Sequence, residues 1–221
     1  MGKVTYTVDL VCCVDITASM EDALNTVKAS LLRFHNDLAR VMTEHGKQID
    51  HLRVKVIRFG DYYVDGKAAI NESPFFDIPQ ESDRFAGFVD SISATSTNSQ
   101  TANGLEALAL AIKSDWSIQG DVKRYVIGVW TDKGTYALEK YKTARLSGYP
   151  TNVPESFDKL TSLWNGMLIG KKRLVIYAPD TYAWKDISNL WENTIHYPSK
   201  AGADLPKQDY RHILESISRS V

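Results

Sequence analysis

The stretch VDLVCCVDITASMED, residues 8–22, decides the fold. Its apolar run from Leu10 stops at Asp15, which is typical of a central parallel strand that is covered on both faces. Apolar residues then recur at alternating steps of three and four, which predicts an amphipathic helix that packs on the sheet and ends near Gly46. This stripe consists of Leu24, Val27, Leu31, Phe34, Leu38 and Val41. The chain therefore starts with a strand followed by a helix.

The same alternation continues along the 221 residues. It predicts an α/β fold, with a doubly wound, mostly parallel sheet and helices on both faces, as a single domain over residues 1–221. Further strands are expected over 51–63, 66–78 (a weaker edge strand interrupted by Pro74), 122–132 and 172–180. Helices are expected over 82–92, over 105–113, from Pro154 to Met167, from Trp184 to Trp191, and over 206–220. Residues 96–103 form a loop and residues 133–153 a connection.

Composition excludes several classes of protein. The net charge of -1 leaves no basic stripe for nucleic acid. No signal peptide is recognisable, and no apolar run approaches the ~20 residues of a membrane span. Cys12 and Cys13 are adjacent in a strand, so they point to opposite faces and are expected to be buried, reduced thiols. A cytoplasmic protein is expected.

Four predicted strands end at or just before an acidic residue. These acids are Asp15, Asp61, Asp132 and Asp180. Because parallel strands present their carboxyl ends at one edge of a sheet, and ligands bind at that edge, we expect Asp15 and Asp132 to meet there, with Asp61 and Asp180 as further candidates.

Two hydroxyl groups follow Asp15 at a spacing of two residues, those of Thr17 and Ser19. One interpretation makes Ser19 the N-cap of the first helix, with Glu21 and Asp22 complementing the helix dipole. That leaves Asp15 and Thr17 unexplained. The other interpretation is a cation site, because carboxylate and hydroxyl oxygens at this spacing are hard ligands that suit Mg²⁺ or Mn²⁺.

These residues resemble a known family. Asp15, Thr17 and Ser19 match the D-x-[ST]-x-S metal-ion-dependent adhesion site (MIDAS) of von Willebrand factor A (vWA) domains. The later VIGVWTDKGT, residues 126–135, resembles that family's strand ending in Thr-Asp, so that Asp132 matches its last metal-site acid. The resemblance implies one antiparallel edge strand in the sheet. It also implies a divalent ion with an open position that an Asp or Glu of a partner protein fills, which is binding rather than catalysis.

The sequence departs from the family pattern in two places. The position that should supply another ligand holds Ala102, which cannot ligate an ion, although Ser99 or Thr101 could substitute if the loop is shifted by one residue. Lys133 follows Asp132, where its ammonium group could compete with an ion, but a side chain that points to solvent is the preferred interpretation.

The C-terminal third has a narrower resemblance. KRLVIYAPDTYAW, residues 172–184, and the segments after it look like bacterial vWA proteins of tellurite-resistance-type stress and phage-conflict systems. This implies an intracellular adaptor that works beside a protein kinase or phosphatase. Resemblance to switchable family members further implies that the last helix, 206–220, shifts when a partner binds.

Two other functions stay open. In a Mg²⁺-dependent phosphatase or phosphotransferase on a similar sheet, Asp15 would be the nucleophile, but the second acid that such enzymes place two residues later is Thr17 here. A degenerate domain that binds partners without metal is the other alternative, and Ala102 keeps it open.

Overall fold

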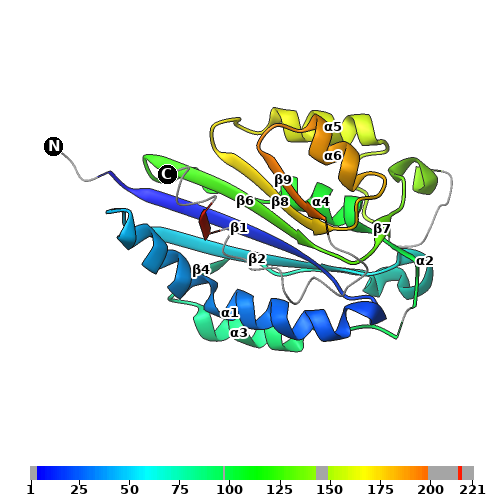
Figure 1. The fold of residues 1–221 in the computed structure, drawn as a ribbon, viewed down its shortest axis with the longest axis horizontal. Coiled ribbons are helices and arrows are strands. Elements are labelled where there is room, and N and C mark those ends of the chain that lie inside the picture. Colours follow the sequence, from blue (N-terminus) through cyan, green and yellow to red (C-terminus); the bar gives the residue numbers. More distant parts are fainter. Residues whose placement is uncertain (1–3, 97, 143–148, 199–213, 216–221) are drawn as a thin grey trace.

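The structure is a computed structural model that describes residues 4–96, 98–142, 149–198 and 214–215. A mostly parallel sheet runs through its centre in the order β3-β2-β1-β6-β8-β9, and β4 also pairs with β2 (Figure 1). The strands are β1 (Tyr6–Asp15), β2 (His51–Phe59), β3 (Ile70–Glu72), β4 (Phe76–Ile78), β6 (Val122–Trp130), β8 (Lys172–Ala178) and β9 (Thr194–Pro198). β3 and β4 pair with β2 in the antiparallel direction, whereas β1, β2, β6, β8 and β9 pair with one another in parallel. The predicted α/β class is confirmed.

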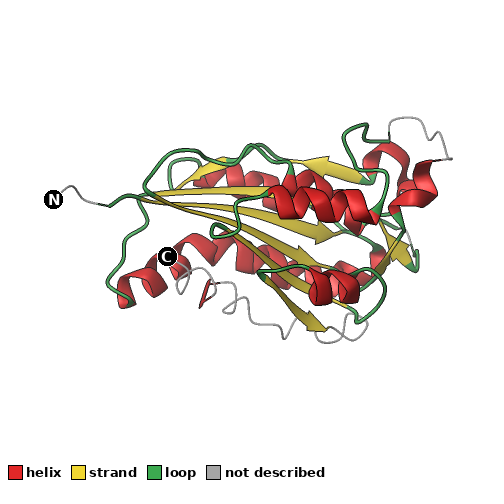
Figure 2. Cartoon of the chain, turned by 90° about the horizontal axis from the view of Figure 1, so that it is seen from above, coloured by secondary structure: helices red, strands yellow, loops and turns green. Residues whose placement is uncertain are grey.

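Helices cover both faces of the sheet (Figures 1 and 2). On one face lie α1 (Glu21–Glu44) and α3 (Ser82–Ser91), and on the other lie α4 (Gly104–Ile112), α5 (Phe157–Gly166) and α6 (Trp184–Leu190). Cys12 packs in the first of these two cores and Cys13 in the second, both as free thiols whose pKa values are raised by burial. Among the described residues, none of the helices combines the length and apolarity needed to cross a bilayer.

Short elements gather near the carboxyl ends of β1, β2 and β6, at the right of Figure 1. They are η1 (Ala18–Met20), α2 (Tyr62–Asp65), η2 (Gly66–Ala68), β5 (Thr101–Ala102), β7 (Gly134–Thr135) and η3 (Leu138–Lys142). The pair β5–β7 forms a small parallel sheet of its own. Residues 133–153, predicted as a connection, therefore contain β7 and η3, and the predicted loop 96–103 contains β5.

One predicted strand needs correction, and one strand of the sheet was not predicted. The edge strand expected over 66–78 is two short strands, because Pro74 has no N–H to give to the ladder. Ser73 continues the pairing up to that break, since its N–H donates to the Val56 carbonyl over 2.9 Å and its hydroxyl accepts from the Val56 N–H over 2.9 Å. No strand was predicted at β9, whose side chains do not alternate cleanly between buried and exposed.

Helix boundaries also differ from the predictions. Ser19 is not the N-cap of α1, because the chain first makes one 3₁₀ turn and Met20 takes the cap position without a side-chain bond. The helix expected from Pro154 begins at Phe157. Ser156 is its N-cap, and the Ser156 hydroxyl accepts a hydrogen bond from the Lys159 N–H. The helix expected over 206–220 lies outside the described residues, apart from residues 214–215, which are helical.

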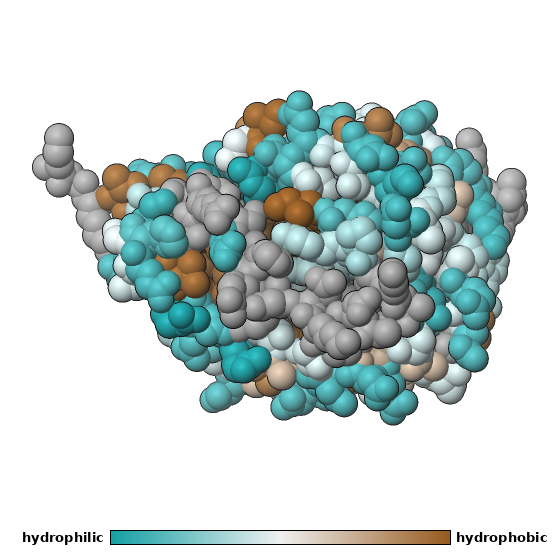
Figure 3. All heavy atoms as spheres, viewed as in Figure 1, coloured by the Kyte–Doolittle hydropathy of each residue, from teal (hydrophilic) through white to brown (hydrophobic). Residues whose placement is uncertain are grey.

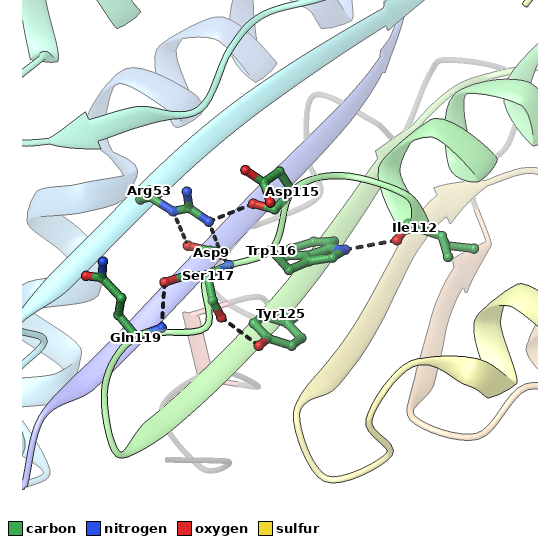
Figure 4. Close-up of polar contacts among 8 residues, drawn as sticks. All are labelled: Asp9, Arg53, Ile112, Asp115, Trp116, Ser117, Gln119 and Tyr125. Carbon is green, nitrogen blue, oxygen red and sulfur yellow. Dashed lines mark hydrogen bonds and ion pairs between the residues drawn. The ribbon is translucent and has the colours of Figure 1, made fainter. Parts of the chain in front are cut away.

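An ion pair between a buried aspartate and a partly exposed arginine, which the sequence analysis did not single out, fastens the loop between α4 and β6 to the sheet (Figure 4). The guanidinium of Arg53 on β2 donates from Nε and Nη2 to the two carboxylate oxygens of Asp9 on β1, over 2.8 and 2.7 Å. The loop adds the Ser117 N–H, which donates to Asp9 over 2.6 Å, and the Asp115 carbonyl, which accepts from Arg53 over 2.9 Å. Asp9 is fully buried, and these bonds offset its loss of water.

Replacing Asp9 with alanine should lower the free energy of unfolding by about 3 kcal/mol, because it leaves the Arg53 charge without its partner. Urea unfolding followed by circular dichroism measures this. Lys159→Ala removes the exposed ion pair with Glu155 and serves as the control, with an expected loss below about 1 kcal/mol. A loss for Asp9→Ala as small as that of the control would contradict a structural role for the pair.

Candidate functional site

The carboxyl ends of β1, β2 and β6 are level with one another. Asp15 pairs with Phe59 in the register of β1 and β2, and Val14 pairs with Trp130 in that of β1 and β6. The segments that follow the three strands are therefore neighbours, at the end of the sheet where α2 and β7 lie (Figure 1). This is the edge at which the sequence predicted a site.

The Asp15 carboxylate is the best-connected group at this edge. Its Oδ1 accepts from the N–H and the hydroxyl of Thr17, both over 2.8 Å, and its Oδ2 accepts from the hydroxyl of Thr131 over 2.5 Å. Burial raises its pKa to about 6 although these hydrogen bonds lower it, and the nearby charge of Asp132 raises it further. The structure therefore brings Asp15, Thr17 and Asp132 together, three of the six residues predicted to bind metal.

Asp132 is buried but incompletely paired. Only 4% of its side chain is exposed, and its Oδ1 has no hydrogen-bond partner among the described residues. Its Oδ2 lies 3.7 Å from the ammonium nitrogen of Lys133, whose side chain is 11% exposed. The expectation that Lys133 points to solvent is therefore wrong.

The backbone explains where Lys133 goes. Its N–H donates to the Thr131 hydroxyl over 3.0 Å, and its carbonyl accepts from the indole N–H of the buried Trp184 over 3.0 Å. Since Thr131 also donates to Asp15, the backbone of Lys133 is tied to both the candidate site and α6. The backbone of Lys133 is therefore fixed, and from this backbone position its side chain lies against Asp132.

The pairing of β5 with β7 sets the register of the loop that contains Ala102, where the family pattern places a further metal ligand. Thr101 pairs with Gly134, and Ala102 pairs with Thr135. The methyl group of Ala102 is buried in the core beneath α4, whereas Thr101 is half-buried. The Thr135 hydroxyl accepts from the Leu105 N–H over 3.2 Å and so caps the first turn of α4. Of the two proposed substitutes for Ala102, Thr101 is thus fixed beside β7.

Ser99, the other substitute, contacts a different acid. Its hydroxyl donates over 2.5 Å to Oδ2 of Asp61, which also accepts from the Tyr136 hydroxyl over 3.0 Å. Asp61 Oδ1 accepts from the Tyr63 N–H over 2.9 Å and caps α2. Asp61 and Ser99 therefore form a neighbouring cluster.

The remaining candidates lie in more exposed places. Ser19 is exposed in η1. Asp180, whose side chain is 52% exposed, pairs with Lys185 over 3.5 Å.

Glu106 in the first turn of α4 is a buried acid that the sequence analysis did not single out. Its Oε1 accepts from the Tyr149 hydroxyl over 2.9 Å, and the Asn103 side chain also hydrogen-bonds to it. Its Oε2 has no partner within the described part of the chain. Burial is the main cause that raises its pKa to about 7, and the charge of Asp61 adds to this. The sequence does carry a signal for this buried acid, because Glu106 is the single acidic residue in the otherwise apolar helix GLEALALAI.

The donor chemistry at Asp15 and Asp132 fits a hard divalent cation. It offers carboxylate and hydroxyl oxygens, and the unpaired Oδ1 of Asp132 is an acceptor that a cation would satisfy. Within the described ranges, no three His, Cys, Asp or Glu side chains are grouped so that they could hold a metal by themselves. Hydroxyls and water would therefore have to complete the coordination, and the Lys133 ammonium opposes it.

The chain is similar to known proteins in structure rather than in sequence. No protein-family model and no curated protein sequence matches the chain. Among solved structures, the pilus adhesin SpaC from Lactobacillus rhamnosus GG has a TM-score of 0.58 and 13% identity, over 99% of this chain and 31% of SpaC. BatB from Bacteroides thetaiotaomicron, described as a conserved hypothetical protein, has a TM-score of 0.52 and 16% identity, over 96% of this chain and 98% of BatB.

Proximal thread matrix protein 1 from the mussel byssus is also similar, with a TM-score of 0.53 and 10% identity, over 97% of this chain and 46% of that protein. This chain thus spans about a third of SpaC and nearly the whole of BatB. Together with the sheet order, these neighbours indicate a vWA-like fold.

Glu106→Gln should make stability less dependent on pH. A folded-state pKa of about 7 against an ordinary 4.5 means that the unfolded chain ionises first, so the wild type loses stability as pH rises from 4.5 to 7 and does not regain it above 7. The variant should be more stable than the wild type by about 3 kcal/mol at pH 8, and this advantage should shrink towards pH 4.5.

Urea unfolding at several pH values measures the difference. Glu44→Gln, at an exposed glutamate near the end of α1, controls for the loss of one carboxylate. An advantage of Glu106→Gln that does not change between pH 5 and pH 8 would show that Glu106 does not titrate in this range.

Proposed function

We propose that the chain is a protein-interaction domain that uses a divalent cation, Mg²⁺ or Mn²⁺, at the carboxyl edge of its sheet. The single observation that carries the proposal is the buried Asp132 carboxylate, which has one oxygen without a hydrogen-bond partner among the described residues beside the hydrogen-bonded Asp15. A buried carboxylate oxygen without a hydrogen bond is costly, and a bound cation would offset this cost.

Each residue has a distinct role in this proposal. Asp15 would hold Thr17 in place. Its negative charge would attract the ion, and its carboxylate would contact the ion largely through bound water. Thr17, Ser19 and Thr101 would present hydroxyl oxygens, and Asp132 would supply its unpaired oxygen. Ser99, which completed the predicted set as an alternative to Thr101, is engaged with Asp61 and would act only indirectly.

The ion would recruit a partner because its ligands neutralise it incompletely. Hydroxyls and water carry no charge, so the ion would attract an Asp or Glu side chain of another protein. On the face shown in Figure 3, the visible described atoms are mostly polar and the apolar ones form small separate patches, which suits recognition through a local polar contact. The proposed setting is a cytoplasmic adaptor in a tellurite-resistance-type stress or phage-conflict system, with a kinase or phosphatase of that system as the partner.

Binding is favoured over catalysis by the state of Asp15. Both of its oxygens accept hydrogen bonds and the side chain is fully buried, so neither oxygen is presented as a nucleophile. The phosphatase alternative requires such a nucleophile. The metal-free alternative remains the competitor, since Ala102 offers no ligand and Lys133 already places a positive charge at Asp132.

Asp15→Asn should fold but bind Mn²⁺ about 10- to 100-fold more weakly than the wild type. The amide oxygen can still accept from Thr17 and the amide nitrogen can donate to the Thr131 oxygen, while the negative charge is lost. Titration with Mn²⁺, with the free ion followed by electron paramagnetic resonance, measures the affinity. Asp180→Asn, at an exposed acid after β8, is the matched control and should bind as the wild type does.

The wild type, Asp15→Asn and Asp180→Asn also test whether partner binding depends on the ion. Each protein is used as bait in native lysate, with Mg²⁺ or with chelator. A partner retained by the wild type and by Asp180→Asn in Mg²⁺, and lost with chelator and with Asp15→Asn, supports the proposal. Equal Mn²⁺ affinities and identical partner sets in all samples would refute it in favour of the metal-free domain.

A further inference from the structure

We infer that Lys133 is a built-in competitor of the cation, so that its ammonium group and a divalent ion exclude one another at Asp132. This inference rests on the proposed function and concerns how the same site is regulated. The Lys133 side chain would then control whether the edge of the sheet accepts an ion.

The competition follows from where the ammonium lies. Lys133 Nζ is 3.7 Å from Asp132 Oδ2, and both side chains are largely withdrawn from solvent. At this separation the attraction is between charges, without a close hydrogen bond, and Oδ1 is left without a partner in the described part of the chain. The carboxylate is thus partly neutralised by a group that a stronger cation can displace.

An ion and the ammonium cannot both stay at this carboxylate without repelling each other. Two positive charges within a few ångströms, screened little by water, disfavour one another strongly. The Coulomb penalty falls on the ion, because Lys133 is covalently attached and always present at the site. Cation affinity should therefore be lower than that of the same oxygen ligands without Lys133.

Displacement is confined to the side chain. The backbone of Lys133 is held by Thr131 on one side and by Trp184 on the other. Rotation about the four-carbon stem is therefore the available motion, and it would carry the ammonium outward from the edge of the sheet. The exchange needs no rearrangement of β6 or β7.

The competition also couples the ion to the partner. When Lys133 leaves Asp132 its charge needs a new counter-ion, and an acidic side chain that approaches the ion would supply one. Ion and partner would then strengthen each other's binding, and linkage requires this effect to be reciprocal. A site of this kind takes its ion tightly only when an acidic partner is present.

Lys133→Met should bind Mn²⁺ about tenfold more tightly than the wild type, because methionine keeps an apolar stem and removes the charge. Lys133→Arg retains the charge and should keep an affinity close to that of the wild type. Lys185→Met is the matched control, since Lys185 pairs with Asp180 at a more exposed position after β8, and its affinity should not change. Unfolding midpoints with and without Mn²⁺ provide a second readout, with the larger upward shift expected for Lys133→Met.

The outcomes separate this inference from the proposed function. Binding that is lost in Asp15→Asn but equal in the wild type and Lys133→Met would overturn the competition and leave the cation site standing. Weaker binding by Lys133→Met would also overturn it, because Lys133 would then support the site. Absence of Mn²⁺ binding in every protein, Lys133→Met included, would remove the proposed cation site and the inference together.

Discussion

The carboxylate of Asp15, buried at the end of β1, is the constraint on which the site depends. A carboxylate without water must be hydrogen-bonded, and its three donors come from the turn after β1 and from the residue after β6. Thr17 bonds to it twice from the turn before α1, and Thr131 bonds to it from the end of β6. Two segments more than a hundred residues apart are thereby held at one edge. Burial raises the pKa of Asp15 to about 6, so this arrangement costs stability at neutral pH, as functional sites often do.

The rest of the edge is built on that connection. Thr131 also accepts from the Lys133 N–H, and the Lys133 carbonyl accepts from Trp184, so one chain of hydrogen bonds runs from the first strand to α6. Beside it, β7 pairs with β5 and caps α4 through Thr135. A backbone held this firmly leaves side-chain rotation as the available change, which is why regulation is assigned to Lys133 rather than to a moving loop.

Much of the fold could be predicted because burial leaves a periodic trace in the sequence. The apolar run ending at Asp15 and the stripe of α1 each follow from a face that must be covered. β9 could not be predicted, since its pattern has no clear period, and neither could the Asp9–Arg53 pair, which joins residues distant in sequence. At the site, the proximity of Asp15 and Asp132 followed from the strand ends. The pairing of Lys133 with Asp132 and the hydrogen bond from Ser99 to Asp61 depend on the conformation of loops, which the sequence pattern does not determine.

Anomalous diffraction from crystals of the wild-type protein grown with Mn²⁺ and an acidic peptide would show whether the cation binds at Asp132 and displaces Lys133. It locates the ion and the Lys133 ammonium in one experiment. We expect an anomalous peak bonded to the unpaired oxygen of Asp132 and to the hydroxyl of Thr17, with Lys133 turned away from Asp132. Ordered density for this edge with no peak, and with Lys133 still beside Asp132, would contradict it.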